Sequence, residues 1–145
     1  MARQCLAKFD TTTPIGSGTN IFFTELNRER PSIADLDLVC YSLNPQVHAF
    51  DNDSLMETPA TQAVTVHSAR GIAQGKPIVV SPVTLKPRFN PHAEGEADVA
   101  PGALPPQVDV RQMSLFAAAW MVGSLKYLLS SGVDAVTYFE TSGWR

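Results

Sequence analysis

Apolar residues occur in four short runs along the chain, each bounded by polar or turn-forming residues. The runs lie at residues 20–26, 36–43, 77–85 and 133–139. Runs of this length that are rich in β-branched and aromatic residues are typical of buried strands. No two-residue hairpin turn joins one run to the next, so the pattern favours parallel strands over antiparallel hairpins.

Two longer segments between these runs have helical features. Residues 51–73 begin with Asp-Asn-Asp-Ser, a typical helix start with Glu57 placed as in a capping box. Pro59 must lie in the first turn of this helix or shift its start, and Gly75 ends it. We expect Asp51 and Asp53 to cap the helix rather than to bind a metal.

In residues 110–131 the apolar positions recur at helical spacing, and Gly132 ends the segment. These positions are Met113, Phe116, Trp120, Leu125 and Leu128. Residues 1–9 have the composition of the end of a helix, and residues 86–106 form a long loop rich in proline, glycine and acidic residues.

The order strand, strand, helix, strand, helix, strand predicts an α/β fold in which helices cover a parallel sheet. We interpret residues 1–145 as one domain. In such folds the ligand binds at the carboxyl ends of the strands. Residues 16–18, Gly-Ser-Gly, precede the first predicted strand, which is the wrong context for a dinucleotide-binding loop.

Three ionisable side chains follow predicted strands at that edge: Glu25, His48 and Glu140. The two carboxyl groups could act as general acid and base. His48 could relay a proton, polarise a carbonyl group or bind a metal, because histidine titrates near neutral pH. The simpler alternatives are solvated or arginine-paired carboxylates and a histidine that holds its own loop.

Further polar and aromatic side chains near this edge are candidate substrate ligands. They are Asn27, Arg28, Tyr41, Asn44, Arg88, Tyr138 and Trp144. A guanidinium group can orient a carboxylate or stabilise an oxyanion, and an indole ring can stack on a sugar-like ring. For the arginines, ordinary surface charge is the alternative.

The composition makes a small polar ligand the expected partner. The net charge is −3 and no basic run exists, so neither nucleic acid nor an anionic membrane is expected. Cys5 and Cys40 match no metal or redox spacing and predict reduced thiols in the cytoplasm, and no secretory signal is evident. The sequence requires no cofactor, and a divalent metal stays open as an alternative.

Four longer strings resemble the barrel domain of D-apionate lactonases. They are Phe-Phe-Thr-Glu-Leu-Asn-Arg-Glu-Arg-Pro (22–31), Tyr-Ser-Leu-Asn-Pro-Gln-Val-His-Ala (41–49), Ser-Pro-Val-Thr-Leu-Lys-Pro-Arg-Phe-Asn-Pro (81–91) and Val-Thr-Tyr-Phe-Glu-Thr-Ser-Gly-Trp-Arg (136–145). The resemblance implies the C-terminal half of a glycoside-hydrolase-like (β/α)8 barrel, strands five to eight, that opens a sugar-acid lactone such as D-apionolactone in carbohydrate catabolism.

Two other functions remain as alternatives. Barrels of this type also cleave glycosidic bonds with two carboxylates. Retaining enzymes of that kind place a glutamate on the seventh strand, whereas residues 78–85 contain no carboxylate. The chain could also be an inactive barrel fragment, because a half-barrel leaves two sheet edges and one sheet face uncovered. Self-association or a complementary half-barrel would cover them.

Overall fold

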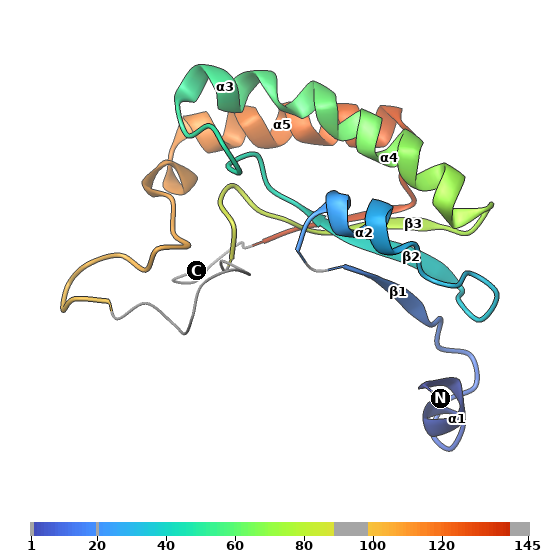
Figure 1. The fold of residues 1–145 in the computed structure, drawn as a ribbon. Coiled ribbons are helices and arrows are strands. Elements are labelled where there is room, and N and C mark those ends of the chain that lie inside the picture. Colours follow the sequence, from blue (N-terminus) through green and yellow to red (C-terminus); the bar gives the residue numbers. More distant parts are fainter. Residues whose placement is uncertain (1, 20, 89–98, 140–145) are drawn as a thin grey trace.

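The computed structural model describes residues 2–19, 21–88 and 99–139, which form a four-stranded parallel sheet with helices packed on one face (Figure 1). The strands are adjacent in chain order, with every pair parallel. They are β1 (Gly16–Thr19), β2 (Leu38–Leu43), β3 (Ile78–Val83) and β4 (Ala135–Tyr138). The helices are α1 (Ala2–Leu6), α2 (Phe23–Glu29), α3 (Asn52–Glu57), α4 (Pro59–Ala73), the 3-10 helix η1 (Val110–Met113) and α5 (Leu115–Ser130). The predicted α/β fold with parallel strands is confirmed.

The first strand is not where the apolar run predicted it. Residues 16–19 form β1, and residues 23–26 of the predicted strand belong to the helix α2 instead. Phe23 and Leu26 are three residues apart, so a helix directs both side chains toward the core, where Leu26 is buried. β1 has no apolar side chain, and therefore it gives no strand signal in the sequence.

The predicted helical segments are each divided in two. Asp51 accepts a hydrogen bond from the Ser54 amide at the start of α3, as predicted for a capping residue, and Pro59 begins the separate helix α4. In the last segment, Ser114 has an extended backbone between η1 and α5. Met113 lies outside α5 and is 97% exposed, so the expectation that it belongs to the apolar face is wrong.

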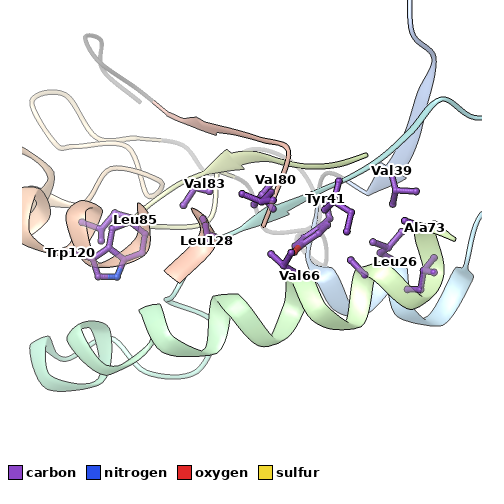
Figure 2. Close-up of a cluster of buried hydrophobic side chains, with 14 of the residues drawn as sticks. Leu26, Val39, Tyr41, Val66, Ala73, Val80, Val83, Leu85, Trp120 and Leu128 are labelled. Atoms are coloured by element: carbon purple, nitrogen blue, oxygen red, sulfur yellow. The ribbon is translucent and has the colours of Figure 1, made fainter. Parts of the chain in front are cut away.

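The core lies between the sheet and the helices (Figure 2). Five residues of the two central strands are fully buried in it, and they alternate along each strand up to the register shift that precedes Val83. They are Val39, Tyr41, Ile78, Val80 and Val83. From the other side, α4 contributes Val66 and Ala69, and α5 contributes Trp120 and Leu128, which confirms Trp120 as a core residue. This packing holds β2 and β3, whose carboxyl ends carry the candidate site, against α4 and α5.

No helix of the described residues covers the opposite face of the sheet (Figure 1). Most of the residues that alternate onto it are small, and Leu38 and Val79 are the larger apolar ones. The small ones include Gly18, Cys40, Ser81, Ala135 and Thr137. Gly18, Ala135 and Thr137 are exposed there. β1 and β4 are each paired on one side only among these strands. A closed barrel would cover this face and both edges.

Candidate active site

The carboxyl ends of the four strands lie at one edge of the sheet, because all the strands are parallel. Glu25 and His48 both follow strands at this edge, β1 and β2. The sequence predicted Glu25 at the end of a strand, and this is wrong. Glu25 lies in the first turn of α2. Its Oε2 atom is buried and has no hydrogen-bond partner among the described residues, and the same holds for Asn44 Oδ1 after β2. A buried acceptor of this kind is costly unless a donor reaches it.

A shallow hollow opens at this edge, between the ends of β1, β2 and β3. Its polar lining consists of Ser42, Asn44, Thr84 and Arg88. Ile21, Phe22, Pro82 and Pro87 form the apolar part. The hollow thus combines Asn44 and Arg88, two of the predicted substrate ligands, with two hydroxyl groups.

Local contacts hold the walls of this hollow. The Ser42 hydroxyl donates to the Ile21 carbonyl oxygen at 2.8 Å, which ties the segment after β1 to β2. The Thr84 amide donates to the Leu43 carbonyl oxygen at 2.9 Å, which ties β3 to β2. The Arg88 guanidinium lies 5.6 Å from the ring centre of Phe139, so a cation–π contact connects it to the segment after β4.

Other predicted site residues lie elsewhere. His48 is exposed and does not line the hollow. Asn27 and Arg28 are exposed further along α2, and Asn27 accepts hydrogen bonds from Arg30 through its carbonyl and side-chain oxygens. Arg30 lines a different hollow, together with Lys76 just before β3. Glu25 comes three residues after Phe22, which lines the hollow, but is not itself part of the lining. The structure therefore does not bring Asn27, Arg28 or His48 together with Asn44 and Arg88.

The two tyrosines point to the helices rather than to the hollow. The Tyr41 hydroxyl lies 2.9 Å from the Thr65 hydroxyl of α4, and burial raises the pKa of Tyr41 to about 12. Tyr138 donates to Ser124 Oγ of α5 at 2.7 Å, and burial raises its pKa as well. Both phenols therefore stay neutral and join the sheet to the helices. This contact is structural, and neither hydroxyl group faces the hollow.

Glu140 and Trp144, the remaining predicted site residues, lie outside the described residues. Among residues 2–19, 21–88 and 99–139, no group of three histidine, cysteine or acidic side chains is placed to hold a metal ion. Within the same ranges, no helix has the length and hydropathy needed to cross a bilayer.

Comparison with known proteins places this sheet in a family. The model of the D-apionate lactonase TIM barrel domain matches residues 2–145. The chain belongs to this family. The resemblance seen in the sequence is thus confirmed, and the four parallel strands with helices on one face constitute part of a (β/α)8 barrel.

One curated member of the family is the D-apionate lactonase of Brucella anthropi. It is 29% identical to this chain over 131 residues, which cover 89% of the chain and 22% of the relative. The chain thus spans about a fifth of the relative's length. No solved structure matches the chain.

The sequence analysis missed Ser42 and Thr84 as lining residues. Both are hydroxyl residues within or directly after apolar strands, at the end where barrel enzymes bind ligands. Their position at the strand ends could have indicated both residues. It did not single them out, because serine and threonine are common in strands and turns.

Proposed function

We propose that these 145 residues supply strands five to eight of a barrel that hydrolyses a sugar-acid lactone such as D-apionolactone. We use the term complete barrel for the chain together with the segment or partner chain that closes it. The observation that supports the proposal is the polar hollow of Asn44, Thr84 and Arg88 at the carboxyl edge, in a member of the D-apionate lactonase barrel family.

The proposed reaction needs a base, an oxyanion ligand and an acid. Glu25, whose Oε2 atom is buried without a partner among the described residues, removes a proton from water, and the water oxygen forms a bond to the lactone carbonyl carbon. Arg88 faces the negative charge on the carbonyl oxygen. The ring C–O bond then breaks, and Glu140 acts as the acid that gives a proton to the leaving alkoxide. The products are a free hydroxyl group and a carboxylate.

Asn44 and the hydroxyl of Thr84 fit the recognition of substrate hydroxyl groups. Asn44 Oδ1 lacks a donor among the described residues, so a sugar hydroxyl that donates to it would remove an unpaired buried acceptor. A site that depends on such a bond discriminates strongly against analogues that lack the hydroxyl group. This supports a polyhydroxylated lactone as substrate.

The test is proton release from aldonolactones by the complete barrel and by its Glu25→Gln and Glu140→Gln variants. We expect kcat to fall by about 100-fold or more in each variant, since general acid–base groups contribute about 10²- to 10⁴-fold. Glu57→Gln, an exposed glutamate at the end of α3, is the control and should leave kcat unchanged. Full activity in both site variants would refute the assignment.

The same assay separates the alternative functions. Aryl glycosides are offered to the same protein, and release of the aryl alcohol without lactone opening would identify a glycosidase instead. If neither substrate is turned over and neither raises the melting temperature, the barrel is inactive.

A further inference from the structure

A polar cluster of two buried residues and one half-buried arginine lies beside the proposed site without lining it. It consists of Gln46, Asp109 and Arg111, which we call the Arg111 clamp. Gln46 is 3% exposed and Asp109 is 7% exposed. Two Arg111 nitrogens donate to the two oxygens of Asp109, at 2.9 and 2.7 Å, in a bidentate pair.

Every donor of the Arg111 side chain is used. Besides the two bonds to Asp109, Arg111 donates to the Phe50 carbonyl oxygen at 3.0 Å, to Asn52 Oδ1 at 2.8 Å and to Gln46 Oε1 at 3.1 Å. The Gln46 amide donates in turn to the Leu85 carbonyl oxygen at 2.7 Å and to Asp109 Oδ2 at 2.6 Å. A guanidinium group has five N–H donors, and lysine could supply only three without the planar fork.

These bonds join the segments that carry the site. Gln46, Phe50 and Asn52 lie between β2 and the start of α3, two to eight residues beyond Asn44. Leu85 lies two residues after β3 and three residues before Arg88. Asp109 and Arg111 lie at η1. The clamp therefore fixes the distance between the backbone that carries Asn44 and the backbone that carries Arg88.

We propose that Arg111, with Gln46 and Asp109, is a positioning residue of the active site. This inference rests on the proposed lactone hydrolysis. Buried ion pairs contribute little stability on balance compared with apolar packing of similar volume, so stability alone does not account for a fully bonded polar cluster at this place. Catalytic groups must be held to within a fraction of an ångström, and hydrogen-bonded support is the usual means.

The experiment measures kcat and KM of the complete barrel with Arg111→Lys, at a temperature where circular dichroism shows the variant fully folded. We expect kcat to fall by about 10- to 100-fold, as for misplacement of a catalytic group by about 1 Å. KM should rise by less than kcat falls, because Arg88 acts on charge that develops in the transition state, whereas Asn44 also binds the hydroxyl groups of the ground state. In an Arg88→Ala background, Arg111→Lys should have almost no further effect on kcat.

Arg70→Lys is the matched control. Arg70 donates to the carbonyl oxygens of Ser131 and Gly132 at the opposite edge of the sheet, so the variant should lower the melting temperature and leave kcat unchanged. If Arg111→Lys does not fold, Gln46→Met takes its place, because it removes the hydrogen bonds of Gln46 to Leu85, Asp109 and Arg111 but keeps the Asp109–Arg111 pair. An unchanged kcat, or an equal loss in the Arg88→Ala background, would overturn the proposal.

A readout without substrate keeps this inference separate from the proposed function. If the unaltered complete barrel opens no lactone, the proposed function fails, and hydrogen exchange then decides on the clamp. Faster exchange in Arg111→Lys that is confined to residues 44–52 and 84–88 supports the clamp. Exchange that is unchanged, or faster throughout the sheet, contradicts it.

Discussion

At the scale of single residues, Asp109 has the most strongly lowered pKa among the carboxyl groups of the described residues. Hydrogen bonds from Arg111 hold the pKa of Asp109 well below its ordinary value of 3.8, against the opposing effect of burial. Since the folded-state pKa is the lower one, the ionised group stabilises the fold above about pH 4, and this contribution disappears as the pH falls through the folded-state value.

Asp109→Asn should therefore lower the free energy of unfolding by about 2 to 3 kcal/mol at pH 7, the range for hydrogen bonds to charged groups. At pH 3 the difference between the variant and the unaltered protein should be smaller. Urea unfolding at both pH values measures this, with Glu57→Gln as the control. A difference that is independent of pH would contradict the assignment.

Gly18 shows a different constraint, the close approach of β1 to β2. A Cβ atom at position 18 would overlap the carbonyl oxygen of Cys40, and backbone atoms cannot move aside as a side chain would. Gly71, in the last turn of α4, has nothing within 4 Å of such a Cβ atom. The two glycines therefore form a natural pair for comparison.

Gly18→Ala should destabilise the protein by about 1 to 3 kcal/mol, as for overpacking, and Gly71→Ala should stabilise it by about 0.5 to 1 kcal/mol through helix propensity. Thermal and urea unfolding of both variants provide the measurement. Equal effects of the two substitutions would show that β1 does not lie against β2 as described.

At the scale of elements, the sequence predicts the place of an element wherever its own side chains enter the core, although at Phe23 and Leu26 it predicted a strand and the structure has the helix α2. β2, β3 and β4 lie inside the predicted apolar runs, and the last helix is recovered from the spacing of Phe116, Trp120 and Leu128. β1 escapes prediction because strand pairing holds it, with Gly16 opposite Leu38 and Gly18 opposite Cys40. Pairing of this kind is a tertiary effect that no local pattern records.

The candidate site divides in the same way. Asn44 and Arg88 were predictable because each follows an apolar run closely, and the carboxyl ends of parallel strands meet at one edge. Tyr41 and Tyr138 could not be assigned to a face, since a shift of one residue in strand register reverses which side a residue takes. The Arg111 clamp joins residues up to 65 positions apart, and only the folded chain brings them together.

At the scale of the whole molecule, two surfaces of the described residues are uncovered: one face of the sheet and the outer side of α5, which carries exposed apolar side chains. Leu115 is 89% exposed, Val122 is 67% exposed and Leu129 is 61% exposed on this helix. An outward face this apolar is unusual for a surface helix and is typical of one that packs against a neighbouring helix. In a (β/α)8 barrel, each helix has such neighbours.

The chain alone should therefore self-associate. We expect it to elute in size-exclusion chromatography above its 15.7 kDa mass and to bind a hydrophobic dye, because unpaired strand edges and an uncovered face join readily to further copies. Thr137→Lys places a charge on the uncovered face and should reduce self-association, whereas Ser68→Lys on the exposed side of α4 should not.

In the complete barrel the same two variants should differ in stability instead. Thr137→Lys should destabilise the closed interior, and Ser68→Lys should leave the stability unchanged. A stable monomer of the chain that unfolds cooperatively would contradict the expected self-association, since it would show that the sheet needs nothing on its other face.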